Sequence, residues 1–245
     1  MKRTFKNYLL LGVLCFNLLG AEAQITSGKI VYERKTNLYK KFKNDKYEDV
    51  KDWLKEEDKN KTDFFELYFN DSMSIFKPQD SDLKEDMSWA TSKNTVYQNF
   101  NKNKRLSIKK IWGEELYVED TLYNRKWKIT ENKRTICGYN CRKAIWKAND
   151  TTKIYVWYSD EIIPNTGPES FYGLPGAILG VATEDGGVIY FAKSVEITKP
   201  ALTLLTPKKG KNKIFTAEEL KAKLKKDFGK YPWGKEMINE NFGLW

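Results

Sequence analysis

The chain has 245 residues, with 43 lysines and arginines against 33 aspartates and glutamates, so its formal net charge at pH 7 is +10. It contains no histidine, which excludes nucleophile systems with a histidine base and metal sites built on imidazole. Enzyme chemistry is thereby restricted to carboxylate pairs, a serine–lysine arrangement or a hard-cation site of oxygen ligands. The sequence also lacks nucleotide-binding, nucleophile-elbow and EF-hand motifs.

The N-terminus has the pattern of a secretory signal peptide. Basic residues at positions 2, 3 and 6 precede an apolar run over residues 8–19, and Ala21 and Ala23 place small residues where signal peptidase reads the chain. The run is too short to span a bilayer, so we expect residues 1–23 to be cleaved. Cleavage removes three basic residues and one acidic residue, which lowers the net charge to +8. The sequence predicts an exported protein, periplasmic or at the cell surface, with one β-rich domain over residues 24–245.

Most of the mature chain is predicted to be strand. Short segments rich in Tyr, Trp, Ile and Val are closely spaced, which favours hairpins of a meandering antiparallel sheet over βαβ units. The fold class is therefore mainly β, a β-rich α+β fold in which we hypothesise that the sheet curves. Asn70-Asp71-Ser72 gives a hairpin signal between two of the strands. Strands are expected over residues 29–33, 64–69, 73–76, 95–100, 106–112, 115–119, 126–130, 142–148, 153–158, 177–183 and 188–197.

Two segments break the strand pattern. Residues 39–60 are dense in Lys, Glu and Asp with few apolar residues, so they predict a charged helical or mobile insertion, anchored by Trp53 and Leu54. A capping box begins at Thr216 and apolar residues then recur at helical spacing, which predicts a helix near residues 216–228 that lies on the sheet. Its lysines would also suit a membrane surface, but three apolar anchors give little insertion energy.

Two cysteines remain after cleavage, Cys137 and Cys141. The three residues between them include a glycine and could turn a hairpin, and directly opposed strand residues lie within disulfide reach. In an oxidising compartment this spacing predicts a disulfide. A redox pair or a two-thiolate metal site is the alternative, although two thiolates without histidine make an incomplete zinc shell. We therefore expect no metal and no cofactor.

The run over residues 171–180 holds three glycines and a proline and carries no charge. Gly173 and Gly176 suit unusual backbone angles, and the apolar residues that follow suit a buried strand. The signature turn Gly173-Leu174-Pro175-Gly176 is thus expected to shape the entry of the strand over 177–183. Within the run only Tyr172 can do polar chemistry, so we expect the contribution of the run to be structural.

Four blocks occur in order along this part of the chain: residues 137–144, Val156-Trp157-Tyr158, the proline pair Pro164 and Pro168, and residues 172–176. In this order and spacing they resemble the signature of the GLPGLI family, also called Porph_ging, a group of exported Bacteroidota proteins with no established activity. The resemblance covers about residues 28–198. Ala177 stands where the family has a leucine, and the family supplies no catalytic residues. The resemblance implies a periplasmic or surface location.

A non-enzymatic binding or envelope-accessory module is the favoured function. We hypothesise that the glycine-proline loop lines the concave face of the sheet and leaves a groove for an apolar ligand, a peptide or a glycan. Aromatic rings suit stacking on such ligands, although each ring would equally suit the core. The ligand-binding candidates are Trp127, Trp146, Trp157 and Tyr172.

Two other classes remain open. A carboxylate-dependent hydrolase would need two converging carboxyl groups, and the acids near the signature are Glu161, Glu169, Glu184 and Asp185. A structural partner of an outer-membrane complex would instead bind an envelope protein. We expect no nucleic-acid partner, because the basic residues occur singly between aromatics on strands, and no transmembrane segment after cleavage.

Overall fold

The structure is a computed structural model, and it describes residues 24–42, 50, 54–80, 87–111, 113–208 and 210–243. The signal peptide expected over residues 1–23 lies outside the described residues. The strands are β1 (Gly28–Asn37), β2 (Asn60–Phe69), β3 (Met73–Pro78), β4 (Thr95–Asn99), β5 (Lys104–Ile111), β6 (Glu114–Thr121), β7 (Lys128–Ile136), β8 (Tyr139–Lys147), β9 (Lys153–Ser159), β10 (Ala177–Thr183), β11 (Val188–Glu196) and β12 (Ile214–Phe215).

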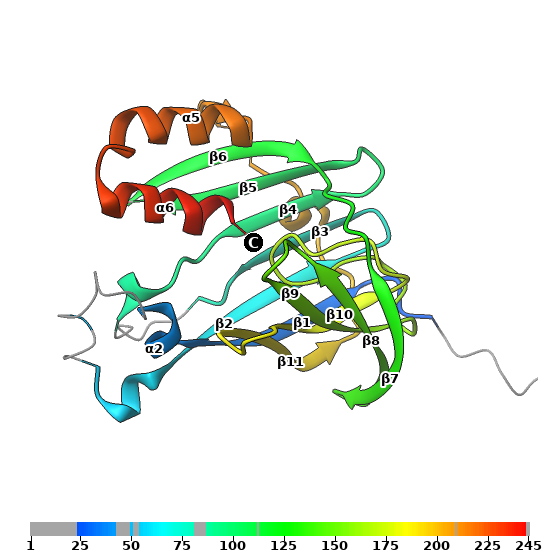
Figure 1. The fold of residues 1–245 in the computed structure, drawn as a ribbon. Helices are drawn as coiled ribbons and strands as arrows, with labels where there is room; N and C mark the ends of the chain where they lie inside the picture. Colours follow the sequence, from blue (N-terminus) through cyan, green and yellow to red (C-terminus); the bar gives the residue numbers. More distant parts are fainter. Residues whose placement is uncertain are drawn as a thin grey trace, which may run out of the picture.

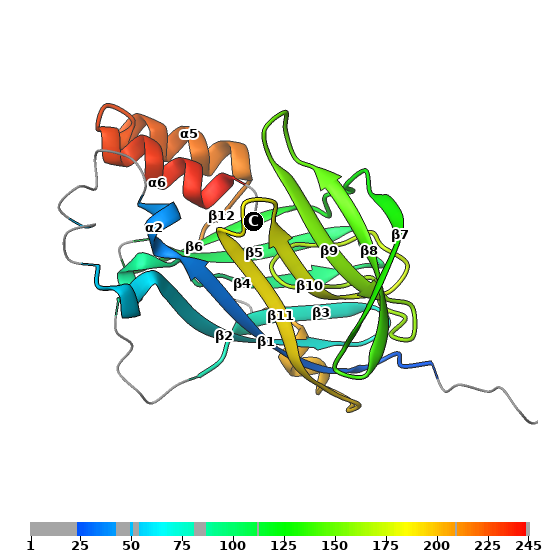
Figure 2. The same ribbon diagram turned by 60° about the horizontal axis from the view of Figure 1, so that its bottom comes forward.

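These strands form one sheet in the order β12-β6-β5-β4-β3-β2-β1-β11-β10-β9-β8-β7. Neighbours run antiparallel except β12, which is parallel to β6. The sheet bends between β1 and β10, so that β8, β9 and β10 lie across the face of the other strands (Figures 1 and 2). The predicted fold class, a mainly β and predominantly antiparallel sheet with a C-terminal helix, is confirmed. The two-residue strand β12 was not expected from the sequence.

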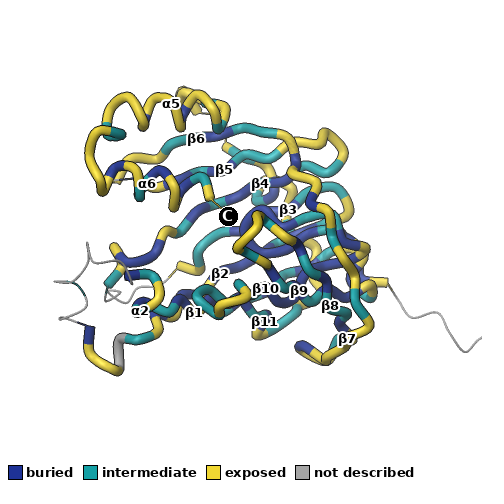
Figure 3. Tube along the Cα trace, viewed as in Figure 1, coloured by how far each residue is buried: buried dark blue, intermediate teal, exposed yellow. Residues whose placement is uncertain are grey.

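The main core lies where the two parts of the bent sheet face each other. Along β1 alternate residues are buried, among them Ile30 and Tyr32, as the two-residue period of a strand dictates. The Phe65 ring stacks on Phe76 with centroids 4.8 Å apart, and the Tyr32 hydroxyl donates to the Ile178 carbonyl at 2.6 Å. Burial of each such aromatic side chain stabilises the fold by about 1.5–3 kcal/mol. Figure 3 shows this burial along the central strands.

The helices are α2 (Leu38–Lys41), α4 (Leu202–Leu205), α5 (Ala217–Phe228) and α6 (Pro232–Phe242). The predicted capping box at Thr216 opens α5, and Leu220 and Leu224 bury against Val118 in a second apolar cluster. The following helix α6 was not expected; its proline stands at a first-turn position, where the missing N–H costs nothing. Among the described residues, no helix combines the length and apolar content needed to cross a bilayer.

The charged segment over residues 39–60 is only partly described. It includes the end of α2 and the 3₁₀ helix η2 (Glu56–Lys59), and a second 3₁₀ helix, η3 (Ser88–Ala90), lies nearby in the fold. Leu54 is buried in a small apolar cluster with Leu38 and Ala90, so it is an anchor as expected. Trp53 lies outside the described residues.

Candidate functional site

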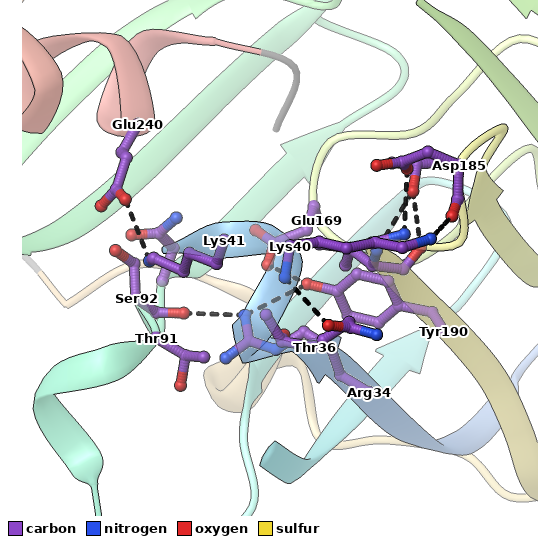
Figure 4. Close-up of a pocket in the computed structure, with 15 residues that line it drawn as sticks. Arg34, Thr36, Lys40, Lys41, Thr91, Ser92, Glu169, Asp185, Tyr190 and Glu240 are labelled. Carbon is purple, nitrogen blue, oxygen red and sulfur yellow. Dashed lines mark hydrogen bonds and ion pairs between the residues drawn. The ribbon is translucent and has the colours of Figure 1, made fainter. Parts of the chain in front are cut away.

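A cavity of about 280 Å³ opens where the end of β1, α2, the β10–β11 turn and α6 come together, and we call it the polar cavity (Figure 4). The inner face of β1 changes from apolar to polar towards this end, because Arg34 and Thr36 follow Tyr32 in the same alternation. The polar cavity is lined by Arg34, Thr36, Asn37, Lys40, Lys41, Thr91, Ser92, Asn94, Glu169, Thr183, Asp185, Gly187, Val188, Tyr190 and Glu240.

Buried charges form one side of the polar cavity. The Arg34 guanidinium donates to Asp63 Oδ2 from Nη2 at 2.6 Å and from Nε at 3.2 Å. Its Nη1 donates to the Ser92 carbonyl at 2.8 Å and to the Tyr190 hydroxyl at 3.3 Å. The Tyr190 hydroxyl in turn donates to Glu169 Oε1 at 2.8 Å. Strands β1, β2 and β11 and the loop before β10 are thus joined by one buried chain of hydrogen bonds.

Glu169 is the acid of this group whose pKa is raised. It is fully buried, and burial raises the pKa of its carboxyl group against the opposing effects of Arg34 and Tyr190. Its backbone is left-handed, with φ of +53°, a conformation that is uncommon and strained for a residue with a side chain. Among the described residues, its Oε2 has no hydrogen-bond partner. Perturbed acids in strained loops are typical of ligand sites.

Charged side chains at the mouth are already paired. Lys41 Nζ lies 3.0 Å from Glu240 on α6, and Lys40 Nζ donates to the Asp185 carbonyl oxygen (Figure 4). Asn37 caps α2 by accepting from the Lys40 backbone N–H at 3.0 Å. The hydrogen-bonding capacity left for a ligand therefore comes from Glu169 Oε2 and from neutral hydroxyl and amide side chains, of which Thr91 already donates to Asp63 and Thr183 is already bonded to the Val188 backbone.

The four aromatic candidates do not converge on the polar cavity. Trp127 and Trp146 pack with centroids 6.4 Å apart, and Trp127 Nε1 donates to the Tyr172 carbonyl at 3.1 Å. Tyr172 stacks on Phe100 at 5.9 Å. Trp157 points to the other face of β9, because the buried residues of that strand are its neighbours in the alternation. Trp127 and Tyr172 thus adjoin the signature turn, whereas Trp146 packs on Trp127 and Phe171 and lines a second cavity.

The signature turn is built into the core. Phe171 and Leu174 are buried in the main cluster, whereas Pro175 is exposed. Gly173 and Gly176 have φ of +96° and +137°, as the expected backbone role requires. The Gly176 N–H donates to the Leu174 carbonyl at 2.8 Å, which closes the turn. None of the four turn residues lines the polar cavity.

The expected disulfide is absent, and both cysteines are free thiols. The sequence interpretation placed a three-residue turn between them, but β7 and β8 are joined by two left-handed residues, Cys137 at φ +51° and Gly138 at φ +87°. Cys141 consequently lies opposite Arg134, and not opposite Cys137. The Cys137 thiol donates to the Ala192 carbonyl at 3.2 Å instead. Across the described residues, no cluster of acids and cysteines could hold a metal ion.

Native alkylation should separate the two thiols. Burial raises the pKa of both, and that of Cys141 to about 12, so neither is a thiolate near neutral pH. We expect iodoacetamide to modify the exposed Cys137 slowly and to leave Cys141 unmodified until the chain is unfolded in urea. Peptide mass spectrometry measures both. Protein that is lighter by two hydrogens and resists alkylation after unfolding without reductant would contradict this expectation.

Sequence reasoning missed Arg34, Asp63 and Tyr190 as site residues. Each lies at an inward position of its strand. For Arg34 and Asp63 the available signal was a charged residue in the apolar phase of the alternation, whereas Tyr190 gives no such signal. Of the four acids considered for hydrolysis, Glu169 and Asp185 line the polar cavity. Glu161 instead accepts from the Asn140 N–H at 2.8 Å, and Glu184 accepts from Lys153 at 2.8 Å.

The chain is similar to two solved structures of PNGF-II, in C2 and P21 space groups. Each has a TM-score of 0.53 and 17% identity; the matches cover 78% and 77% of this chain and 31% of PNGF-II. The chain thus spans about a third of PNGF-II's length, and at this identity the likeness shows the fold alone. An uncharacterized conserved protein from Thermus thermophilus aligns with a TM-score of 0.42, 6% identity and coverage of 84% of this chain and 98% of its own. No curated protein matches. A family model described as "Protein of unknown function (Porph_ging)" matches residues 146–180.

Proposed function

The chain carries the Porph_ging family segment at residues 146–180, which confirms the resemblance, and from this premise we propose that it is a non-enzymatic binding module whose polar cavity takes a neutral polyhydroxyl ligand. Such a ligand is a sugar unit at the end of a glycan. The family description names no activity, so the proposal depends on the chemistry of the cavity.

The sugar-binding proposal rests on one observation: the lining of the cavity is largely neutral and polar, and its cations are paired. Hydroxyl and amide side chains can each donate and accept, which matches the hydroxyl groups of a sugar. The cations are engaged, because Arg34 binds Asp63 and Lys41 binds Glu240. Val188 is the aliphatic residue of the lining, so a lipid chain would leave polar groups without partners. The neutral polar lining comprises Thr36, Asn37, Thr91, Ser92, Asn94 and Thr183.

We further propose that binding takes place outside the cytoplasm, at the periplasmic or cell-surface location that the N-terminal pattern predicts. A sugar-binding module there could serve an envelope protein as an accessory subunit. The bent sheet supports this role by holding the cavity walls on β1, β11 and α6, elements fixed by the core and by the Lys41–Glu240 ion pair.

Calorimetric titration with a panel of free monosaccharides tests the proposal. We expect at least one sugar to bind, and Ser92→Tyr to weaken that binding by at least about tenfold, which corresponds to about 1.4 kcal/mol. Ser92 is exposed at the cavity and gives Arg34 only its backbone carbonyl, so a tyrosine there fills space without breaking that bond. Ser88→Tyr, on exposed η3 and away from the lining, is the matched control.

Binding by no sugar of the panel, or equal binding by wild type and Ser92→Tyr, would reject the sugar site. Loss of binding in Ser88→Tyr as well would show a general effect of the substitution and would equally count against the proposal.

A carboxylate-dependent hydrolase is the second candidate, favoured by the two acids that share the cavity. Burial raises the pKa of Glu169, which suits a general acid. For Asp185 burial also acts to raise the pKa, but hydrogen bonds from Thr183 and the Gly187 N–H lower it overall. Nitrophenyl glycosides distinguish the candidates: release of nitrophenol that Glu169→Gln abolishes supports the hydrolase, and binding without release supports the module.

A further inference from the structure

A second cavity of about 590 Å³ lies between β5, β6, the end of β8 and the end of α6. It is separate from the polar cavity, although adjacent residues reach both: Glu169 lines the polar cavity and Ser170 lines this one. Trp146, one of the aromatic candidates from the sequence, belongs to its wall. We call it the cationic cavity.

Three cations line the cationic cavity against one acid. The cations are Arg105, Lys109 and Arg125, and the acid is Asp120. Asp120 is already engaged, because its Oδ2 lies 3.2 Å from Arg105 Nη2 and its Oδ1 accepts from the Ala217 N–H at 3.2 Å. Among the described residues, neither Lys109 nor Arg125 forms an ion pair, and Glu169 and Asp120 act on Lys109 only through longer-range attraction. The local charge is therefore a positive excess.

Both of these unpaired cations are deeply buried. Lys109 is 6% exposed and Arg125 is 5% exposed. Arg125 donates from Nη1 to the Ser170 carbonyl at 2.9 Å and from Nη2 to the Ser170 hydroxyl at 3.2 Å, but its Nε has no partner in the part of the chain that the structure describes. The Lys109 ammonium forms no hydrogen bond within those residues either. Buried charges are normally paired or fully hydrogen-bonded, so two that are not suit the binding of an anion.

The protonation energetics agree with this arrangement. Burial lowers the pKa of Lys109 to about 8 against the opposing charges of Glu169 and Asp120, and burial together with the charge of Arg105 lowers the pKa of Arg125 to about 10. Burial thus disfavours the charged forms of these two side chains. An anion would favour them and would remove the repulsion between the cations.

The rest of the wall of the cationic cavity is aromatic and suits the uncharged, organic part of a ligand. The Arg125 guanidinium lies over the Phe171 ring at 4.4 Å and over the Trp146 ring at 4.9 Å, and Lys109 Nζ lies 5.6 Å from the Phe242 centroid. Tyr123 adds a further ring. Aromatic faces beside the cations offer apolar and stacking contacts to the part of a ligand that carries no charge.

We propose that the cationic cavity binds an organic anion whose carboxylate, sulfate or phosphate group contacts Lys109 and Arg125 while its ring or chain packs on Trp146 and Phe242. The planar fork of Arg125 suits the oxygens of such a group, and the Lys109 ammonium supplies a second charge. This site is independent of the sugar site, so failure of one leaves the other standing.

Isothermal titration near neutral pH with matched pairs of probes tests the site. Benzoate is compared with benzyl alcohol and glucuronate with glucose, and inorganic sulfate and phosphate are the third arm. We expect an organic anion to bind and its neutral partner not to bind. Binding of sulfate or phosphate as tight as that of the organic anions would overturn the organic part of the proposal and leave a site for free inorganic anions.

Lys109→Met removes the buried charge and keeps an unbranched side chain, and Lys110→Met makes the same change at the next position of β5, which is exposed. We expect Lys109→Met to lower the affinity for the anion at least about tenfold and to raise the melting temperature without ligand, whereas Lys110→Met changes neither. Loss of binding together with higher stability cannot come from misfolding. Anion binding by Lys109→Met at wild-type affinity would overturn the proposal.

A pH series supplies a second readout. The groups that face Lys109 are Arg105 on its own strand, Asp120 on β6, Arg125 and Glu169. Because Lys109 loses its proton as the pH rises above about 8, the affinity of the wild type for the anion should fall there. Lys109→Met should lack this fall, and an equal fall in both proteins would count against the role of Lys109.

Discussion

Gly176→Val will destabilise the protein by at least about 4 kcal/mol, enough to leave little folded chain. Gly176 has φ of +137°, and a Cβ atom there would lie 2.0 Å from the Ser159 carbonyl oxygen. That oxygen belongs to the buried end of β9, which pairs with the first residue of β10, so it cannot retreat without opening the sheet. Soluble yield and urea unfolding followed by circular dichroism measure the effect.

Gly138→Val is the matched control for Gly176→Val. Gly138 also has a left-handed backbone, with φ of +87°, but a Cβ atom there meets nothing within 4 Å. Gly138→Val should therefore destabilise the protein only by the cost of a left-handed backbone at a residue with a side chain, about 1–3 kcal/mol. If the two variants prove equally stable, the close approach to β9 is not what requires a glycine. A Gly176→Val protein as stable as wild type that had lost ligand binding would show a functional loop instead of a structural one.

The strands could be predicted from sequence because their signals are local. Residues 177–183 form an uncharged, largely apolar run that is followed by turn residues, and β10 has these bounds. At the β2–β3 hairpin, Asn70 Oδ1 accepts from the N–H groups of Ser72 and Met73, which is the turn chemistry that asparagine favours. One local signal failed: the β7–β8 turn has two residues instead of three, and this changed the partner of Cys141.

The polar cavity could not be predicted from the sequence, because the residues that form its wall are distant from one another in the chain. Arg34 binds Asp63, 29 residues away, and Tyr190, 156 residues away. Their meeting depends on the strand order, in which β1 lies between β2 and β11, and no local pattern encodes that order. What the sequence does show is a charged residue at an inward strand position, as at Arg34 and Lys109. That pattern predicts a buried charge without naming its partner.

Asp63→Asn should cost about 3–5 kcal/mol, because it leaves two buried cations, Arg34 and Lys61, without their anion. Asp63 Oδ2 accepts from Arg34 and, at 3.0 Å, from the Thr91 hydroxyl, while Oδ1 lies 3.4 Å from Lys61 Nζ and 3.3 Å from Lys93 Nζ. Asparagine keeps the shape but turns one acceptor into a donor that faces these cations. For a chain of this size the melting temperature should fall by about 10 °C.

The stability lost in Asp63→Asn should depend on pH, and this dependence identifies the Asp63 carboxylate as its source. Burial acts to raise the pKa of Asp63, but Arg34, Lys61 and Lys93 outweigh it and hold the pKa below its usual value. A carboxyl group whose pKa is lowered on folding stabilises the protein fully above its unfolded pKa, about 3.9, and loses that contribution as the pH falls through the folded value. The stability difference between wild type and Asp63→Asn should therefore shrink below about pH 4.

Asp150→Asn is the matched control, since Asp150 pairs with Lys147 at 3.0 Å but its side chain is 99% exposed. We expect it to change the free energy of unfolding by less than about 0.5 kcal/mol at any pH, because exposed pairs contribute little. Urea unfolding of the three proteins from neutral pH down to pH 3 measures both effects. An Asp63→Asn protein as stable as the control at neutral pH would mean that Arg34 does not need this carboxylate, and that the wall of the polar cavity is held by Tyr190 and Glu169 instead.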